Sequence, residues 1–574
     1  MTTPDIIAEV CENWLSRPSF FARLAPGVWY IFAVSGSRAR QHTLQPGRRN
    51  FKEKSYFMKT AVAAVARPSA EELPAGPSRQ HPMDTYRNFI KGEWVESSSQ
   101  RTTENVNPAN TEDVLGVVRL STREEARGAV EAAAEAFRGW RSTPAPARGR
   151  IVARFARLLE EHKESVAALL TREEGKTVSE SRGELQRAIN VAEFCAGESR
   201  RMNGETIPSE LPSNFAYTIK QPHGVVAVVT PWNFPIAIPV WKLAPALVAG
   251  NTVVFKPATN TPATAVRLVE LFAEAGLPPG VLNLILGSGS EAGDEIVNHR
   301  AVRAISFTGS NQVGVSLYEQ AARRGVRVQC EMGGKNPVVV LEDADLGLAV
   351  ESTAQGAFGS TGQRCTATSR AVVVESVADE FVRRISERAQ ALRLGDGANP
   401  ETEVGPLVDA SQFKTVLSYM DVAREDGAEL VTGGGPADGA GLRKGFFVKP
   451  TVFDRVTPDM RIAREEVFGP VLSVLRVKDF DEALLVANDS EYGLSSSVFT
   501  SDATSVFRFV DEIETGMTHI NSPTTGGEAH VPFGGIKSTG VGAFEQGSTA
   551  LDFYTELKVV YVDYTGRKRE GNLY

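Results

Sequence analysis

The chain has 574 residues, of which 42% are hydrophobic and 23% charged, a composition typical of a large soluble globular protein with about two to four domains. Its formal net charge of -8, with acidic and basic residues interspersed, argues against a general role in binding nucleic acid or membrane surfaces. Four widely spaced cysteines without metal-type pairs predict no metal site, no disulfide framework and a reducing, cytoplasmic location.

The first 82 residues differ in composition from the rest of the chain. The short apolar stretch 24–34 follows a segment with acidic residues such as Asp5, an order that matches a secretory signal poorly. No apolar run approaches the roughly 20 residues that a membrane-spanning helix needs. Residues 68–82 are rich in proline and polar side chains, as linkers are. We therefore expect residues 1–82 to be a disordered or spurious extension, with a targeting segment as the alternative.

Two helical regions are predicted after this extension. Ser121 and Glu124 match a capping box, and an alanine-rich helix follows them. A second, longer helical region is predicted over about residues 149–202. Both regions precede the first predicted buried strand.

From residue 225 onward, short apolar runs alternate with helices. Buried strands are predicted at 225–230, 251–257, 281–286 and 304–310. This alternation predicts parallel βαβ units with helices on both faces of the sheet. Since ligands bind at the carboxyl ends of such strands, the turns there are candidate binding sites. The sequence has no GxGxxG fingerprint, so a dinucleotide would bind by a variant of the Rossmann geometry, with a helix near Gln312 facing a phosphate.

One cysteine lies in an unusual setting. The run GSTGQRCTA (359–367) surrounds Cys365 with glycines and polar side chains, whereas a structural cysteine usually lies among aliphatic ones. Cys365 is therefore either an incidental loop thiol or a nucleophile. Cys330 lies in an apolar run and is predicted to be a strand thiol, and neither Cys11 nor Cys195 has reactive neighbours.

Seven short motifs occur in the order in which aldehyde dehydrogenases carry them. They are TPWNFP (230–235), FKPATNTP (255–262), FTGS (307–310), EMGGKNP (331–337), GQRCTA (362–367), EEVFGPV (465–471) and PFGG (532–535). The chain therefore resembles the aldehyde dehydrogenase superfamily from about Tyr86 to Tyr564. One such motif would be weak support, whereas seven in order are strong.

The resemblance implies an α/β fold with three parts. A variant Rossmann domain that binds NAD(P) is expected over residues 83–203 and 223–333, and an α/β catalytic domain over 334–540. A β bridging element from 204–222 and 550–564 would join a neighbouring subunit's sheet, which implies a homodimer or homotetramer.

The resemblance also implies a mechanism. Cys365 would attack the aldehyde, and the side-chain amide of Asn233 and the backbone N–H of Cys365 would stabilise the oxyanion. Glu331 would activate the water that hydrolyses the thioester. Because relatives that transfer the acyl group to coenzyme A lack a glutamate here, Glu331 favours release of a free acid. Two other classes stay open: a cysteine hydrolase that pairs Cys365 with a histidine, and an inactive structural or binding protein with this fold.

The cofactor residues follow from the same resemblance. Lys256 is similar to the lysine on the adenosine ribose, and Thr259 stands where many NAD-using relatives carry a glutamate. Because threonine leaves space for a 2′-phosphate that a carboxylate would repel, we expect use of both cofactors with NADP slightly favoured over NAD. The complete set of expected cofactor contacts is Trp232, Lys256, Thr259, Gly309, Ser310, Glu466 and Phe468.

The substrate is the least determined part of the prediction. The loop 520–535 and the run 329–346 look most like semialdehyde dehydrogenases that act on 2-oxoglutarate semialdehyde, while succinate semialdehyde, sugar-type aldehydes or a broad range remain open. An anionic substrate needs an arginine or several hydroxyl and amide donors. The candidates for this contact are Ser360, Thr361, Arg364 and Thr524, together with His530 as a loop histidine. Phe544 replaces an arginine that relatives commonly have before a glutamate.

Overall fold

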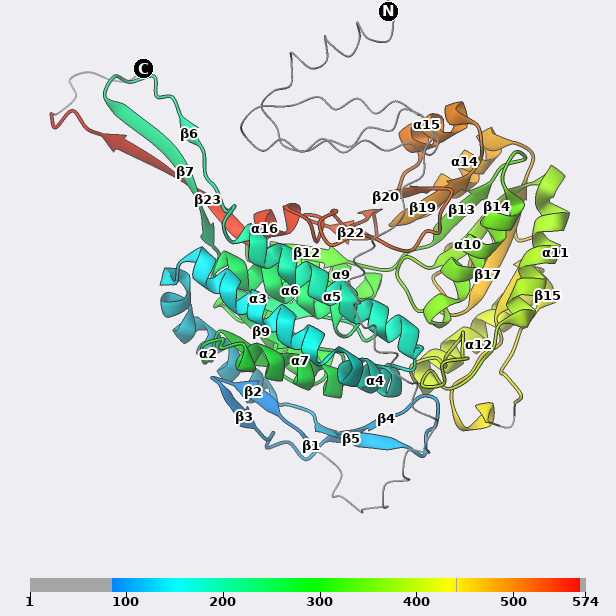
Figure 1. The fold of residues 1–574 in the computed structure, drawn as a ribbon, viewed down its shortest axis with the longest axis horizontal. Helices are drawn as coiled ribbons and strands as arrows, with labels where there is room; N and C mark the ends of the chain where they lie inside the picture. Colours follow the sequence, from blue (N-terminus) through cyan, green and yellow to red (C-terminus); the bar gives the residue numbers. More distant parts are fainter. Residues whose placement is uncertain (1–84, 440, 568–574) are drawn as a thin grey trace, which may run out of the picture. The chain divides into compact units, whose positions relative to one another are not determined.

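The computed structural model describes residues 85–439 and 441–567, and the expected extension over residues 1–82 lies outside them. The described residues form a mixed α/β fold with parallel sheets, as the sequence predicts (Figure 1). Within these residues, no helix combines the length and the apolar character that crossing a membrane requires. The cytoplasmic location stays a prediction from the cysteine content.

The first sheet has eight strands in the order β22-β12-β11-β8-β9-β10-β2-β3. The predicted strands are confirmed, and they form its parallel centre with β12. These five strands are β8 (Val225–Val229), β9 (Thr252–Lys256), β10 (Leu282–Leu284), β11 (Val302–Thr308) and β12 (Arg327–Glu331). The antiparallel members are β2 (Asn88–Ile90), β3 (Glu93–Val95) and β22 (Gly540–Val541).

Helices cover both faces of this sheet, as expected for parallel βαβ units (Figure 1). On one face lie α3 (Ala145–Glu161), α4 (Lys163–Glu174), α5 (Val178–Glu198), α6 (Ala237–Ala249) and α7 (Pro262–Glu274). On the other lie α2 (Arg123–Ser142), α8 (Asp294–Asn298) and α9 (Asn311–Ala322). Strand β8 therefore has a helix layer on each side, which explains why its residues read as one apolar run.

Two details of the helical region differ from the sequence prediction. The capping box of α2 is one residue later than expected: the Thr122 hydroxyl accepts from the Glu125 N–H, and the Glu125 carboxylate accepts from the Thr122 N–H. Ser121 is not the cap, because its hydroxyl donates to the carbonyl of Leu286 at 2.7 Å. The helical region predicted over about 149–202 is confirmed, but it begins earlier, at Ala145, and consists of three helices divided at His162 and at Gly175–Thr177.

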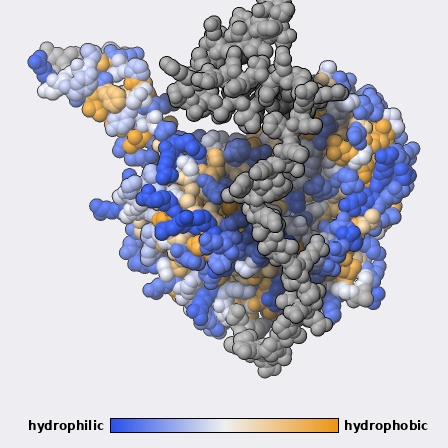
Figure 2. All heavy atoms as spheres, in the orientation of Figure 1, coloured by the Kyte–Doolittle hydropathy of each residue, from blue (hydrophilic) through white to orange (hydrophobic). Residues whose placement is uncertain are grey.

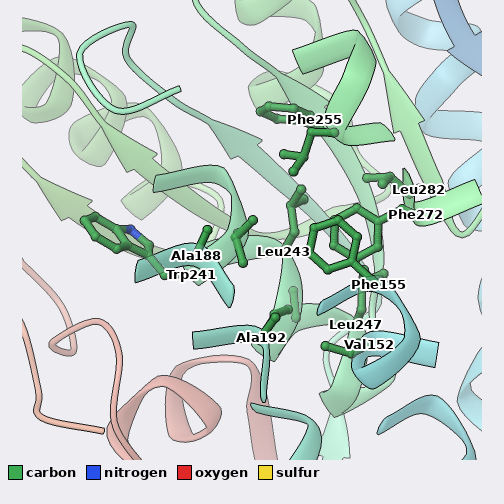
Figure 3. Close-up of a cluster of buried hydrophobic side chains, with 14 of the residues drawn as sticks. Val152, Phe155, Ala188, Ala192, Trp241, Leu243, Leu247, Phe255, Phe272 and Leu282 are labelled. Carbon is green, nitrogen blue, oxygen red and sulfur yellow. The ribbon is translucent and has the colours of Figure 1, made fainter. Parts of the chain in front are cut away.

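A stacked pair of phenylalanine rings anchors the helices on the first sheet. The Phe155 ring of α3 lies 3.7 Å from the Phe272 ring of α7, and Leu243 and Leu247 of α6 surround them (Figure 3). All four side chains are fully buried. Since α6 is buried along its whole length, this packing fixes the turn that precedes it, where Asn233 lies.

The second sheet has seven strands in the order β15-β16-β17-β14-β13-β19-β20. Its parallel members are β13 (Asn336–Val340), β14 (Thr368–Val374), β16 (Thr451–Asp454), β17 (Val471–Val477), β19 (Ser495–Phe499) and β20 (Met517–Ile520), and β15 (Glu429–Thr432) is antiparallel. The helices of this part are α10 (Leu346–Phe358), α11 (Glu375–Ala391), α12 (Ala410–Glu425), α13 (Arg461–Arg464), α14 (Phe480–Asn488) and α15 (Ala503–Glu512). The chain crosses from the first sheet to the second between Glu331 and Asn336.

A three-stranded arm, separate from both sheets, is made by β6 (Thr206–Ile207), β7 (Asn214–Pro222) and β23 (Thr555–Asp563), in the order β23-β7-β6. Strands β7 and β23 pair antiparallel over nine residues, from Thr555 opposite Pro222 to Asp563 opposite Asn214. The arm extends away from α3 and α5 and carries apolar side chains at its surface (Figures 1 and 2). The short helix α16 (Thr549–Phe553) leads into β23.

Two further small sheets complete the described fold. One joins β1 (Thr85–Tyr86), β4 (Thr102–Val106) and β5 (Val114–Arg119), and the other pairs β18 (Tyr492–Gly493) with β21 (Ile536–Lys537).

Candidate active site

A cavity of about 280 Å³ lies where the carboxyl ends of the first sheet's strands meet loops of the second sheet. Seven of the ten predicted site residues line it. From the first sheet come Trp232, Asn233, Gly309 and Ser310, and from the second part of the chain come Cys365, Glu466 and Phe468. The other three predicted residues, Lys256, Thr259 and Glu331, do not line this cavity.

The loop that carries Cys365 is held in a strained conformation. Ser360 and Thr361 have φ angles of 49° and 56°, which cost about 1–3 kcal/mol each for residues other than glycine. Gly362 also has a positive φ, and a Cβ there would lie 2.1 Å from the Gly469 carbonyl oxygen. Hydrogen bonds from the surroundings hold the loop, including one from Asn336 Nδ2 to the Cys365 carbonyl at 2.8 Å. The thiol is therefore presented by a fixed backbone.

The Cys365 thiol is partly buried, and its pKa is high. Burial raises this pKa to about 12, and the nearby carboxyls of Glu466 and Glu331 add to the effect. At neutral pH the resting thiol is therefore protonated, and a base must take its proton before the sulfur can act as a nucleophile.

Asn233 lies in the turn between β8 and α6, and its side chain points to the cysteine loop. Its Nδ2 donates to the Gln363 carbonyl at 2.9 Å. The backbone carbonyl of Asn233 accepts from Lys176 Nζ at 2.6 Å, and Lys176 forms a buried ion pair with Glu184, also at 2.6 Å. The second oxygen of Glu184 accepts from the two amides at the start of α6. This network orients the amide of Asn233 before any substrate arrives.

Glu331 is the last residue of β12 and has only 4% of its surface exposed. Burial raises its pKa well above the ordinary value, and the neighbouring carboxyl of Glu545 raises it further. Among the described residues, nothing hydrogen-bonds to its Oε2. A buried carboxyl with a free oxygen and a raised pKa has the properties of a general base that works near neutrality.

Glu466 and Phe468 line the cavity from the second part of the chain. Glu466 Oε1 accepts from the Gly334 N–H at 3.0 Å, and burial raises its pKa to about 7. A Cβ at Gly333 would lie 2.0 Å from Glu466 Oε2, so only glycine fits beside this carboxyl. The Phe468 ring meets the Trp232 ring edge-on, with centroids 5.4 Å apart.

The donors at the end of the first sheet suit a dinucleotide. Helix α9 begins after Ser310, whose side chain does not cap it, so the amides of its first turn are available to a phosphate. Lys256 is 5% exposed, and its Nζ donates to the Pro257 carbonyl at 2.9 Å. Burial lowers the pKa of Lys256 to about 8. Thr259 is half-buried, and its hydroxyl donates to the Gly287 carbonyl at 3.3 Å.

Residues 94–560 match the model of the aldehyde dehydrogenase family. The chain belongs to this family. The alpha-ketoglutarate semialdehyde dehydrogenase of Haloferax volcanii is 48% identical over 84% of this chain and 100% of its own length. The alpha-ketoglutaric semialdehyde dehydrogenase of Bacillus subtilis is 44% identical over 83% of this chain and 98% of its own. A betaine aldehyde dehydrogenase from Staphylococcus aureus, solved in complex with NAD+, has a TM-score of 0.82 and 38% identity, and the match covers 84% of this chain and 95% of that one.

The predicted family, fold and enzyme class are therefore confirmed. This aldehyde dehydrogenase is an oxidoreductase that uses NAD(P) to oxidise an aldehyde. The resemblance to semialdehyde dehydrogenases, expected from the loop 520–535 and the run 329–346, is likewise confirmed by its relatives.

The side chains expected to bind an anionic substrate in this aldehyde dehydrogenase already have partners within the protein. Arg364 pairs with Glu180 at 3.2 Å and donates to the Ser360 hydroxyl at 2.9 Å. Thr361 donates to the Gly405 carbonyl, and Thr524 to the Thr366 carbonyl. His530 is exposed, 3.6 Å from the carboxylate of Glu528. The expectation that Arg364 and its neighbours hold the anion is therefore not supported, because their donors maintain the cysteine loop.

The sequence analysis missed a buried ion pair behind Glu331. Lys242, in the middle of α6, is fully buried; its Nζ donates to the Ser306 hydroxyl at 3.0 Å and pairs with the carboxylate of Glu545. The sequence does carry a signal for this pair, a lone lysine in the apolar run IPVWKLAPALVAG. Because a buried charge without a counter-charge is too costly to occur, such a lysine predicts a buried acidic partner. Phe544 directly precedes Glu545 in the sequence, and its ring packs against Gly534.

Proposed function

We propose that Cys365 is the nucleophile, Asn233 the oxyanion donor and Glu331 the general base of this aldehyde dehydrogenase. The observation that carries the proposal is that Asn233 and Cys365 line one cavity with Glu466, while Glu331 ends the strand beside it with one oxygen free. The strained loop holds the sulfur in place, and the Lys176–Glu184 pair holds the amide. Such preorganisation stabilises charge as it develops in the transition state.

The reaction follows from these groups. The Cys365 proton passes to a base, and the sulfur adds to the aldehyde carbon while the Asn233 amide and the Cys365 N–H donate to the oxygen. Glu466, Phe468, Trp232 and the start of α9 would hold NAD(P), which when bound would accept the hydride of the adduct and so leave a thioester on Cys365. Glu331 then takes a proton from water, which attacks the thioester on Cys365 and releases the carboxylic acid.

The nucleophile is tested by replacement and by trapping. We expect Cys365→Ala to lower kcat by at least about 1,000-fold and to leave NAD(P) binding intact. Cys195→Ala is the matched control, because that thiol is buried in α5 and has no part in the proposed chemistry. Mass spectrometry of the wild-type enzyme in a single turnover should find the acyl group on Cys365, and an acyl group on any other side chain would refute the assignment.

We propose 2-oxoglutarate semialdehyde as the substrate. The proposal is supported by relatives at 43–48% identity that are named for this aldehyde, including the 2,5-dioxopentanoate dehydrogenase of Saccharolobus solfataricus. A second candidate is malonate semialdehyde, because a malonate-semialdehyde dehydrogenase of Geobacillus kaustophilus is 42% identical. A comparison of kcat/KM for semialdehydes of different length, with NAD and NADP separately, tests the choice.

The preference for NADP over NAD is also a proposal. It is supported by Thr259, a short neutral side chain at the carboxyl end of β9, and by the buried cation of Lys256, which has no carboxylate partner among the described residues. Such a cation favours an additional phosphate.

Assembly into a homodimer or homotetramer through the arm is proposed as well. Strand β23 is an edge strand, and its side chains Leu557, Val559 and Tyr561 are 67%, 52% and 71% exposed. Because they alternate along the strand, they form one apolar face. Strand β20 leaves an open edge on the second sheet, which the arm of another copy could extend.

A further inference from the structure

A short segment, residues 331–336, joins the first sheet to the second and contacts several groups of the proposed site. It begins at Glu331, the proposed base. The N–H of Gly334 donates to Glu466 Oε1 at 3.0 Å, and Asn336 Nδ2 donates to the Cys365 carbonyl at 2.8 Å. Lys335 lies between Gly334 and Asn336 in this segment, and the proposed chemistry gives it no part.

Lys335 is a buried ammonium whose bond is to a backbone carbonyl. The residue is 2% exposed, and its Nζ donates to the carbonyl of Glu465 at 2.7 Å. The carboxylate of Glu465 is bonded elsewhere, to Arg461 at 2.9 Å and to the Tyr419 hydroxyl at 2.7 Å. Because a buried charge is costly unless it is paired and hydrogen-bonded, packing alone does not explain a lysine here.

The carbonyl that Lys335 contacts belongs to a strained loop, residues 465–468. Phe468 has a φ of 55°, which a residue other than glycine keeps only when its surroundings hold it. At this end of the loop, Gln412 Nε2 donates to the carbonyls of Val467 and Phe468 at 3.1 and 2.9 Å. Lys335 holds the other end at Glu465. Glu466 lies between these two fixed points and lines the cavity.

Lys335 also acts on Glu466 through its charge. Burial raises the pKa of Glu466 to about 7, and the Gly334 N–H and the ammonium of Lys335 both oppose this effect. In return, burial lowers the pKa of Lys335 to about 7, and the carboxyl of Glu466 opposes that change. The charged forms of the two side chains therefore stabilise each other.

The groups around this pair do not replace the ammonium. The other titratable side chains that act on Lys335 or Glu466 are Arg370, Glu465, Tyr492 and Cys365. Arg370, the cation among them, lowers the pKa of Lys335, and its Nε donates to the Lys335 carbonyl at 3.0 Å. Lys335 is thus the cation that offsets the burial of Glu466.

We infer that Lys335 is a positioning residue for cofactor binding, whose ammonium holds residues 465–468 so that the Glu466 carboxylate faces the cavity. Lys335 does not itself line this cavity, so it acts through Glu466. Its positive charge also favours the carboxylate form of Glu466, which is the stronger acceptor for a ribose hydroxyl. The inference rests on the proposed role of Glu466 as a cofactor contact.

The test is a double-variant cycle with a pH series. Lys335→Met removes the bond and the charge, Lys335→Gln keeps a donor without the charge, and Lys478→Met changes an exposed lysine as the matched control. Glu466→Gln and Lys335→Met/Glu466→Gln complete the cycle. The dissociation constants of the apoenzyme for NAD and NADP are measured by fluorescence titration from about pH 6 to about pH 9, and chemical denaturation reports whether each variant is folded.

We expect Lys335→Met to weaken NAD and NADP binding by about 10- to 100-fold at neutral pH. Loss of the cation raises the pKa of Glu466, so the pH at which affinity increases should move upward by about 0.5 to 1 unit. Lys335→Gln should show the same upward shift with a smaller loss of affinity, and it tests the charge even if Lys335→Met does not fold. The double variant should bind like Glu466→Gln, and Lys478→Met like wild type.

Two results would overturn the inference while the role of Glu466 stands. In one, folded Lys335→Met or Lys335→Gln keeps the wild-type affinity and pH dependence. In the other, the losses from Lys335→Met and Glu466→Gln multiply in the double variant, which would mean that Lys335 acts independently of Glu466. If Glu466→Gln alone binds both cofactors like wild type, the proposed role of Glu466 is wrong, and the inference falls with it.

Discussion

Lys242 and Glu545 form an ion pair that is closed off from water, and Glu545 is the charged group that most raises the pKa of Glu331. The carboxyl of Glu331, the proposed base, is therefore influenced by two buried charged groups. Glu545 raises its pKa, and the ammonium of Lys242, which pairs with Glu545, lowers it. A change at Lys242 or at Glu545 therefore alters the pKa of Glu331.

Lys242→Met should destabilise the enzyme, because it leaves Glu545 buried without its counter-charge. We expect a loss of about 3–5 kcal/mol in the free energy of unfolding, measured by chemical denaturation. The double variant Lys242→Met/Glu545→Leu, which removes both charges, should recover most of that loss. Lys449→Met, which breaks an exposed pair with Asp438, is the control and should leave the midpoint unchanged. A double variant as unstable as the single one would contradict this account.

Glu331→Gln should separate the two halves of the reaction. Since the amide cannot take a proton from water, we expect a burst of reduced cofactor followed by a steady state about 10²- to 10⁴-fold slower than wild type. Stopped-flow absorbance at 340 nm measures both phases. The exposed Glu342→Gln is the control, with unchanged kinetics. A variant with no burst and a normal steady rate would remove Glu331 from its proposed role.

Glu466 predicts a pH-dependent affinity for the cofactor. Its pKa of about 7 means that it is neutral below this pH and ionised above it, and the ionised form is the stronger acceptor for ribose hydroxyls. The affinity of the apoenzyme for NAD(P), followed by fluorescence titration, should rise as the pH increases through 7. Glu466→Gln should remove this dependence. Glu465→Gln should keep it, because Arg461 already holds the pKa of Glu465 below its ordinary value.

Thr259→Glu should reverse the proposed cofactor preference. The new carboxylate would repel a 2′-phosphate and accept from a 2′-hydroxyl, so we expect kcat/KM with NADP to fall by about tenfold or more relative to NAD. Thr259→Ala, which adds no charge, is the control and should keep the wild-type ratio. An unchanged ratio in Thr259→Glu would show that residue 259 does not face the 2′-position.

The parts of this protein that could be predicted from the sequence are those in which a local run of residues indicates its own structure or role. The buried strands around Val228 and Phe255 are apolar runs because helices cover both faces, and that pattern is visible without a structure. Cys365 stands out by its glycine-rich surroundings, and the resemblance to aldehyde dehydrogenases makes it the predicted nucleophile. Thr122 was missed as a cap because Ser121, one residue earlier, also fits the pattern. Only the bond of Ser121 to the carbonyl of Leu286, 165 positions away, excludes it.

The parts that escaped prediction depend on partners far apart in the sequence. Lys242 and Glu545 are 303 positions apart, and Lys335 and Glu465 are 130. No periodicity links such residues, since only the packing of elements distant in the sequence brings them together. For the same reason Arg364, the nearest arginine to Cys365 in sequence, was the obvious anion ligand, and its pairing with Glu180 could not be foreseen.

The nine-residue pairing of β7 with β23 also has a consequence for the order of events in the cell. Strand β7 is translated long before residues 555–563. The edge of β7 that pairs with β23 therefore lacks a partner while hundreds of residues are still being made. The arm can therefore close only after residues 555–563 have left the ribosome. If copies of the chain assemble through this arm, as proposed, they do so after residues 555–563 have been synthesised. A nascent chain that lacks these residues cannot join the assembly through the arm.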